Sequence, residues 1–434
     1  MAKQYQKGFF EFIAAADSEK VHSQTIGWIF SKDCDVFEQN EKNEILNKLI
    51  FKSNEEIQDF KPTNIQVEID DIDILIESED WVIVIENKIK SSQHSNQLFK
   101  YEYITAPNTK TALDCYEKWK LIDFPKDNFK SKFENANPKE RAKLISDWVS
   151  NWSKQDKLKI KDLKTVEIED RYRSKSSKYV YLTLIKENPK SGNWIPITYS
   201  LLHSVFNAYF LKKEEKNLQH YAIVKSYLST IGNLSNVAQS FIDNPREFEF
   251  VFKEGKTRKN QIVEKDFISG KSYIKELQLE TLLQKWYYTN LIEKINETKN
   301  ELLNNIEHNV GETRGTALLD FRFNEIKIEG VSYSPILQFQ GNAIKLALAG
   351  STKTENKGVT KRKEEFAERL KKIKDFQELF TKNPKISTPR KEFGFLSINI
   401  NEAENFWQVQ HSPEIFVIEK IKMAKKIFKE IEDK

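Results

Sequence analysis

Cysteine and histidine are scarce in this sequence. The 434 residues include two cysteines, Cys34 and Cys115, which form no C-x-x-C pair, and six scattered histidines. A zinc site or a disulfide framework requires more of these residues at closer spacing, so neither is expected to organise the fold. This usage is typical of a reducing compartment, and we predict a cytoplasmic protein.

Long apolar runs are also missing. Residues 1–20, MAKQYQKGFFEFIAAADSEK, contain only a short apolar patch that acidic residues interrupt. No run approaches the roughly 18 apolar residues that a membrane-spanning helix needs. We therefore expect neither export nor a membrane partner.

The sequence has little net charge. Its 69 lysine and arginine residues against 65 aspartate and glutamate residues leave +4. This excess does not by itself indicate nucleic acid, although a binding groove needs only a local excess of positive charge. The apolar content of 39% is enough to bury real cores, and the length predicts two or three domains.

Strands with charges in unusual places stand out at residues 72–90, IDILIESEDWVIVIENKIK. Alternating and continuous apolar residues predict strands at 65–69, 72–76 and 81–85. A helix over about 18–31, capped by Ser18, precedes them, and helical character continues to about residue 52. A helix near 97–104 and a fourth strand at 178–185 follow.

The whole chain is expected to have three parts. Residues 1–205 form an α/β core with a helical insertion at 106–177. Residues 206–310 form a helical middle region that includes one long amphipathic helix at about 273–306. Residues 311–434 form an α+β domain, with four strands, a charged helix near 361–380 and a closing helix after Pro413.

Three charged residues in the strand region form a pattern with chemical meaning. Glu86 and Lys88 are two apart, so they share a face of one strand, and Asp73 on a neighbouring antiparallel strand can reach that face. A Glu-x-Lys triplet recurs elsewhere in the chain, but only at Glu86 does it end an apolar strand. Two carboxylates and a backbone carbonyl at a strand end are hard oxygen ligands suited to Mg²⁺. The alternative is an exposed strand face with ordinary ion pairs.

These residues resemble the PD-(D/E)xK nuclease superfamily, in particular its bacterial branch with a Q-L-x-x-Y helix. The resemblance spans roughly the first 205 residues without the insertion. It rests on Glu19 in EKVHS, Asp73 in IDILI, Glu86 and Lys88 in IVIENKI, Gln97 and Tyr101 in NQLFKY, YLTL at 181–184 and ITYSLL at 197–202.

The resemblance implies a restriction-endonuclease-like core, in which a mixed central sheet is flanked by helices. It also implies roles for single residues. Asp73 and Glu86 would ligate Mg²⁺ together with the backbone carbonyl of Asn87, and Lys88 would act on the attacking water. Glu19 would approach the metal or its waters, and Gln97 and Tyr101 would shape the substrate side of the pocket.

The expected function is therefore Mg²⁺-dependent cleavage of DNA, with Mn²⁺ as a substitute metal, in bacterial restriction or anti-phage defence. Two alternatives stay open: a non-catalytic nuclease fold that binds nucleic acid or protein, and a nuclease directed at RNA. A homodimer, for which the 273–306 helix could supply the contact, and a partner protein of a defence system also stay open.

Overall fold

A computed structural model defines the fold of the chain in two compact units, Gln6–Asn236 and Val237–Lys434. The structure describes residues 8–51, 62–69, 72–90, 97–105, 135–137, 140, 172, 175–214, 217–248, 250–253, 270–298, 303, 306–313, 315–328, 331–340, 343–350, 372–373, 385–386, 395–400 and 413–432.

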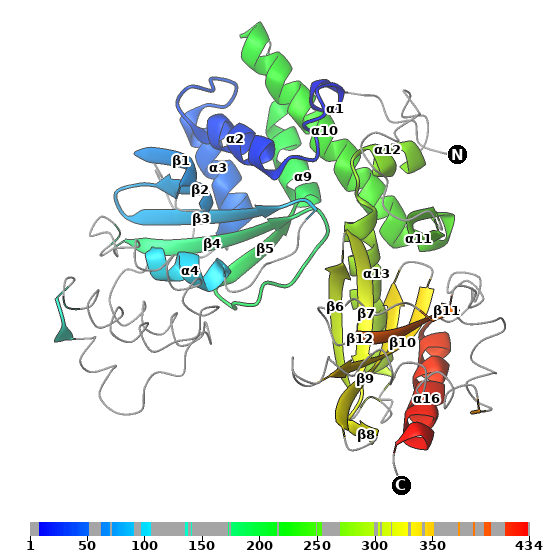
Figure 1. Cartoon of the computed structure of the whole chain (residues 1–434). Helices are drawn as coiled ribbons and strands as arrows, with labels where there is room; N and C mark the ends of the chain where they lie inside the picture. Colours follow the sequence, from blue (N-terminus) through cyan, green and yellow to red (C-terminus); the bar gives the residue numbers. More distant parts are fainter. Residues whose placement is uncertain are drawn as a thin grey trace. The chain divides into compact units, whose positions relative to one another are not determined.

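The first unit is built around a five-stranded sheet (Figure 1). Its strands lie in the order β1-β2-β3-β4-β5; the pairs among β1, β2 and β3 are antiparallel, whereas β3-β4 and β4-β5 are parallel. The elements are α1 (Phe9–Phe12), α2 (Glu19–Phe30), α3 (Gln39–Ile50), β1 (Asn64–Ile69), β2 (Ile72–Glu77), β3 (Trp81–Lys88), α4 (Gln97–Ile104), β4 (Ser176–Thr183), β5 (Trp194–Thr198), α9 (Tyr199–Phe210) and α10 (Leu218–Asp243), whose residues from Val237 on belong to the second unit. This mixed sheet with flanking helices confirms the predicted α/β core.

Local sequence explains the elements nearest to the strand ends. Ser18 caps α2, since its side chain accepts a hydrogen bond from the Val21 amide at 3.4 Å. Strand β3 is buried from Val82 to Lys88, as expected for a strand covered on both faces. Strand β5 was not predicted; it lies at the edge of the sheet and contains Pro196, which an edge strand tolerates.

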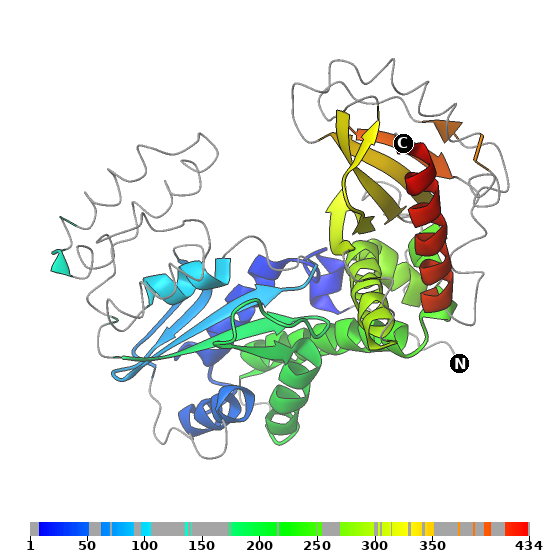
Figure 2. The ribbon, with the colours of Figure 1, turned by 90° about the horizontal axis from the view of Figure 1, so that it is seen from below.

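Helices cover both faces of this sheet (Figure 2). Tyr179 of β4 is hydrogen-bonded to Thr105, directly after α4, at 3.1 Å. Tyr179 pairs with Val84 in β3, so α4 covers the face that carries Val84 and, two residues on, Glu86. Helices α3 and α9 lie on the opposite side in Figure 2.

The second unit contains a seven-stranded antiparallel sheet of order β11-β12-β10-β9-β7-β6, with β8 paired to β9. Helices α13 and α16 pack against it, which confirms the predicted α+β fold of this part. Its elements are η3 (Pro245–Phe248), α11 (Phe250–Lys253), α12 (Gly270–Glu276), α13 (Glu280–Glu297), β6 (Glu307–Thr313), β7 (Thr316–Arg322), β8 (Ile326–Ile328), β9 (Val331–Gln340), β10 (Ala343–Gly350), β11 (Lys385–Ile386), β12 (Phe395–Ile400) and α16 (Pro413–Ile431).

The prediction of one helix over 273–306 is wrong, because the chain breaks it between α12 and α13. Gln278 has φ of 54°, in the left-handed region. The amides of Leu279 and Gln278 bond back to the carbonyls of Ile274 and Lys275, the pattern that closes a helix C-terminus. Burial of Leu277 and Leu279 on both sides of the break helps to offset the strain at Gln278.

Two further sequence expectations fall largely or wholly on residues that the structure leaves undescribed. The 106–177 insertion lies outside the described residues except for a few positions, and so does the charged helix near 361–380. The three-part division of the chain stays a prediction; its boundaries at 205 and 310 fall inside α9 and β6.

Gly27 permits close approach of α2 to β1, and we expect Gly27→Ala to destabilise the first unit. A Cβ atom at this position would lie 2.6 Å from the Cγ2 atom of Val67. Overpacking of this kind costs about 1–3 kcal/mol, against a gain of up to about 1 kcal/mol in helix propensity. Denaturant unfolding should show a net loss, and a second substitution, Val67→Ala, should reduce the cost of adding the methyl group. An equal cost in both backgrounds would contradict this explanation.

Candidate active site

The register of β2 and β3 brings Asp73, Glu86 and Lys88 together. Ile74 pairs with Ile85, so the same register continued by one residue sets Asp73 opposite Glu86. Lys88 lies on the same face because it follows Glu86 by two residues. The Nζ atom of Lys88 is 2.5 Å from Oε1 of Glu86.

Burial makes the Glu86 carboxylate unusual. Its side chain is 0% exposed, and that of Lys88 is also buried. The Lys88 ammonium and the Asp73 carboxyl are its close polar neighbours. A fully buried carboxylate beside a second carboxylate is costly, so these oxygens are suited to bind a cation.

The protonation equilibria reflect this burial. Desolvation raises the pKa of Asp73 to about 6, despite the opposing effect of Lys88. Desolvation, together with the negative charge of Asp73, raises the pKa of Glu86 to about 8. Burial opposes the charged form of Lys88, but the nearby Glu86, Asp73 and Glu19 carboxylates raise its pKa overall. One lysine therefore does not compensate fully for the carboxylates, whereas a divalent cation could.

Asn87 adds a backbone carbonyl on the side of β3 that faces Asp73. The Leu184 amide donates to the Lys88 carbonyl at 3.2 Å, so the backbone groups of Lys88 face β4. Alternation directs those of Asn87 toward β2. The Asn87 amide accordingly donates to Oδ2 of Asp73 at 2.7 Å. Two carboxylates and the Asn87 carbonyl are thus the oxygen donors that could hold Mg²⁺.

Glu19 reaches the end of β3 from the first turn of α2. Its Oε1 atom accepts hydrogen bonds from the amides of Ile89 and Lys90 at 2.9 and 3.2 Å. Its Oε2 atom lies 4.0 Å from Nζ of Lys88. Glu19 therefore contacts the chain around the site, and its approach to a metal stays a prediction.

The donor set is limited in number. Within the described residues, no group of three or more histidine, cysteine, aspartate or glutamate side chains could hold a metal ion. Mg²⁺ is often bound by one or two carboxylates, with waters completing its octahedron. The candidate set of Asp73, Glu86 and the Asn87 carbonyl therefore fits this metal without a third carboxylate.

Gln97 and Tyr101 form a pair of their own on α4. The Gln97 side-chain amide donates to the Tyr101 hydroxyl at 2.6 Å, and Tyr101 is fully buried. Glu102 of the same helix accepts hydrogen bonds from the side chains of Trp194 and Asn193 at 2.8 and 2.7 Å, which fixes α4 to β5 and to the residue before it. Because α4 covers the face that carries Glu86, Gln97 and Tyr101 lie on the correct side of the sheet. Their role toward a substrate stays a prediction.

The sequence did not reveal a buried polar network on the other face of β3. The Asn87 side chain donates to the Glu19 carbonyl and to Oγ of Ser23, both at 3.0 Å. It also accepts a hydrogen bond from the Tyr199 hydroxyl at 2.6 Å. Ser23 follows Glu19 by four residues on α2, and this helical spacing could have indicated that Ser23 lies near the site. Tyr199 lies in the segment ITYSLL, but no feature of the sequence distinguishes it from its neighbours.

His22 is part of the same buried region. Its Nε2 atom lies 2.9 Å from the Ala16 carbonyl, which can only accept, so Nε2 carries the proton. Its Nδ1 atom is therefore the acceptor for the Tyr227 hydroxyl at 3.2 Å. Desolvation lowers the pKa of His22 to about 4. These contacts give His22 a structural role in the neutral form.

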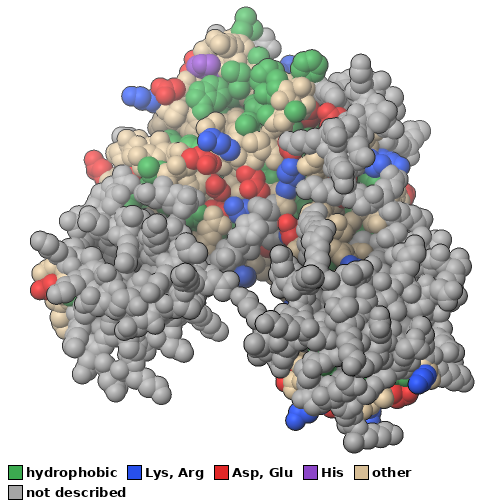
Figure 3. All heavy atoms as spheres, in the orientation of Figure 1, with side chains coloured by type: hydrophobic (Ala, Val, Ile, Leu, Met, Phe, Trp, Pro, Cys, Tyr) green, Lys and Arg blue, Asp and Glu red, His purple; other side chains and the backbone are tan. Residues whose placement is uncertain are grey.

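Charged side chains also surround the site at the surface. Lys90 forms an ion pair with Asp17, just before α2. On the face drawn in Figure 3, acidic and basic side chains lie close together near α2 and β3. The surroundings are mixed in sign, so they do not compensate for the buried carboxylates.

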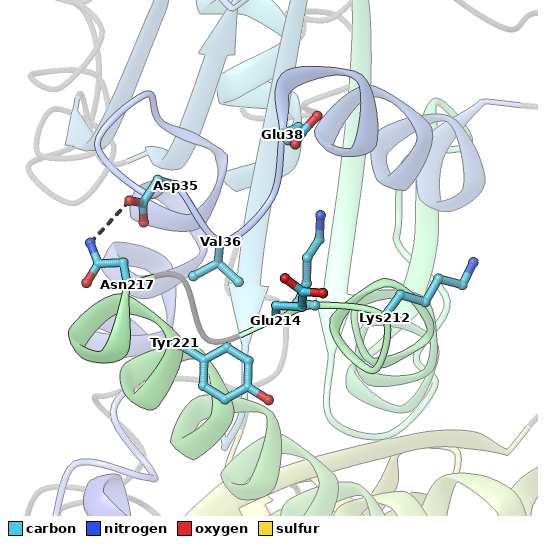
Figure 4. Close-up of a pocket in the computed structure, with 8 residues that line it drawn as sticks. Asp35, Val36, Glu38, Lys212, Glu214, Asn217 and Tyr221 are labelled. Atoms are coloured by element: carbon cyan, nitrogen blue, oxygen red, sulfur yellow. Dashed lines mark hydrogen bonds between the residues drawn. The ribbon is translucent and has the colours of Figure 1, made fainter.

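A separate pocket of about 240 Å³ lies near the ends of α9 and α10 (Figure 4). Its lining is mixed in charge, and Asp35 accepts a hydrogen bond from Asn217 at 3.1 Å. None of the residues predicted for catalysis lines it. The lining residues are Asp35, Val36, Glu38, Lys212, Lys213, Glu214, Asn217 and Tyr221.

Comparison with known proteins identifies the class of the first unit. Residues 7–199 match the family model of the PD-(D/E)XK nuclease superfamily. This segment, with its mixed sheet and its acidic strand ends, is similar to that superfamily. No curated protein and no solved structure gives a significant match to the chain. Among the described residues, no helix is both long and apolar enough to cross a membrane.

His22 makes the stability of the first unit depend on pH. The folded-state pKa of about 4 lies below the ordinary value of 6.5, so the unfolded chain binds the proton more readily between these values. The contribution of His22 to the free energy of unfolding is therefore fully present above pH 6.5. It should fall as the pH decreases, by about 2 kcal/mol between pH 7 and pH 5. The raised pKa values of Asp73 and Glu86 act in the opposite direction.

The comparison of parent and His22→Gln isolates this contribution. In urea unfolding at pH 7 and pH 5, the free energy of unfolding of the variant should decrease less than that of the parent, by the amount assigned to His22. The same change in stability with pH in both proteins would contradict a buried neutral histidine.

Proposed function

We propose that this chain is a divalent-metal-dependent nuclease that hydrolyses phosphodiester bonds of DNA. The observation that carries the proposal is the cluster of Asp73, Glu86 and Lys88, in which the fully buried Glu86 carboxyl lies beside both other side chains. The match of residues 7–199 to the family model of the PD-(D/E)XK nuclease superfamily supports it.

The residues divide the chemistry among them. Asp73, Glu86 and the Asn87 carbonyl would hold Mg²⁺, and Mn²⁺ has similar oxygen preferences. When bound, such a cation activates water and stabilises negative charge on the phosphate. Lys88 would position the attacking water, since its ammonium group is held beside Glu86. Gln97 and Tyr101 would shape the substrate side of the sheet.

The biological setting that we propose is bacterial restriction or anti-phage defence in the cytoplasm. It rests on the resemblance to the branch with the Q-L-x-x-Y helix, of which Gln97 and Tyr101 are the matching residues. DNA is the proposed partner, and a second copy of the chain or another defence protein could complete the assembly.

Substitution of the cluster should abolish cleavage. We expect Asp73→Asn, Glu86→Gln and Lys88→Ala to lower Mg²⁺-stimulated cleavage of plasmid DNA by about a hundredfold or more, because each removes a group that binds the metal or the water. A matched RNA substrate, digested in parallel, should be cleaved less than the DNA.

Glu77→Gln is the matched control for these variants. Glu77 is also buried and lies 3.5 Å from a lysine, Lys175. It occupies the last position of β2, four residues after Asp73 and therefore at the other end of the strand. This variant should cleave like the parent. Parental activity in Asp73→Asn and Lys88→Ala would make the site assignment wrong, and stronger cleavage of RNA would make the substrate assignment wrong.

Metal binding separates a nuclease from a pure binding module. In calorimetric titration without nucleic acid, the parent should bind Mn²⁺ or Mg²⁺, and Asp73→Asn should bind at least about tenfold more weakly because it loses a charged ligand. Glu77→Gln should retain the parental affinity. If the parent binds neither metal, a catalytically inactive nuclease fold becomes the better explanation.

A further inference from the structure

The side chain of Asn87 points away from the carboxylates on either side of it in the sequence. Glu86 and Lys88 share one face of β3, so Asn87 lies on the other, where it is 0% exposed. Its amide nitrogen donates to the Glu19 carbonyl and to Ser23 of α2, and its amide oxygen accepts from Tyr199 of α9. Two helices therefore hold this side chain in one orientation.

The orientation of Asn87 matters because its backbone takes part in the candidate metal site. The Asn87 amide donates to Oδ2 of Asp73 at 2.7 Å, and its carbonyl faces the same side of the strand. A rotation of this residue would move the carbonyl and release the Asp73 carboxylate together. Hydrogen bonds to the Asn87 side chain on one face of β3 thus fix two groups of the candidate metal site. These groups are the Asp73 carboxylate on the other face and the Asn87 carbonyl at the strand edge.

Tyr199 is suited to fix this orientation because its own position is strongly determined. It is the first residue of α9, directly after the N-cap Thr198, whose side chain accepts a hydrogen bond from the Leu201 amide at 3.3 Å. Its ring is fully buried and packs edge-on against His22 with centroids 5.3 Å apart. His22 is in turn bonded to the Ala16 carbonyl and the Tyr227 hydroxyl.

We propose that Tyr199 is a positioning residue for the divalent-metal site, acting through its hydrogen bond to the Asn87 side chain. This inference rests on the proposed function only in so far as the site binds a metal. The bond itself is 2.6 Å long and buried, and it connects the start of α9 to the strand that carries Glu86 and Lys88. A tyrosine that only filled the core would act through its ring and would not need the hydroxyl.

Tyr199→Phe tests the hydroxyl while the ring stays in place. In the full chain, we expect the affinity for Mn²⁺, measured by calorimetry without nucleic acid, to fall about tenfold, as is typical when a partner of a metal-site residue is removed. The metal concentration that gives half-maximal DNA cleavage should rise by a similar factor, while the cleavage rate at saturating Mn²⁺ should stay close to that of the parent.

Tyr209→Phe is the matched control on the same helix. The Tyr209 hydroxyl donates to Glu44 at 2.7 Å, and its ring is also buried. Its loss should leave the Mn²⁺ affinity unchanged. An unchanged affinity in Tyr199→Phe, or an equal loss in both variants, would overturn the assignment.

Hydrogen exchange at the Asn87 amide provides a readout that needs no metal. Because this amide bonds to Asp73, loss of the Tyr199 hydroxyl should increase its exchange rate at least about tenfold in the metal-free protein, whereas Tyr209→Phe should not. If the parent binds no metal, the proposed function fails, and this measurement still tests the positioning. An Asn87 amide that exchanges equally in the parent and in Tyr199→Phe would overturn it.

Discussion

The buried carboxylate of Glu86 is the constraint on which the rest of the first unit depends. A charged group without exposure is tolerated only where other groups compensate for the lost hydration. Lys88 lies 2.5 Å away, yet desolvation and the neighbouring Asp73 still raise the pKa of Glu86 to about 8. Among the described residues, the groups at the end of β3 therefore do not balance its carboxyl groups fully, as expected for a site that binds a cation.

The surrounding architecture keeps this costly arrangement in place. Antiparallel pairing sets Asp73 opposite Glu86, and parallel pairing with β4 buries β3 on its other edge. The Glu19 carboxylate binds the amides of Ile89 and Lys90 directly after the strand. Each contact restricts the chain where the charges meet, so the strand end can retain a geometry that charge repulsion alone would not favour.

The two faces of β3 carry different groups and pack against different helices. One face carries the charged groups and is covered by α4, whereas the other presents the Asn87 side chain to α2 and α9. In the second unit, a polar group is again buried within a sheet: Asp320 accepts a hydrogen bond from Gln338 on the adjacent strand at 2.8 Å. There the carboxylate faces a neutral hydrogen-bond donor, whereas the Glu86 carboxyl faces a second carboxyl group and a lysine.

The sequence alone determined the elements and the faces of the candidate site. Apolar periodicity predicted β2, β3 and β4, Ser18 marked the start of α2, and a spacing of two residues fixed Glu86 and Lys88 on one face. These features are local, because strand and helix periods are properties of the backbone. The break at Gln278 was not predictable in this way, since Leu277 follows Ile274 by three residues and Leu279 precedes Leu283 by four, both helical spacings.

Only the tertiary structure decided which distant groups meet. Strand pairing set Asp73 opposite Glu86, and the packing of α9 brought Tyr199 to Asn87, 112 residues away in the sequence. Periodicity carries no information about such contacts, because they depend on how the elements pack. The degree of burial, and with it the raised pKa of Glu86, arises from the same packing: the sequence supplies the carboxylate, and the fold removes its water.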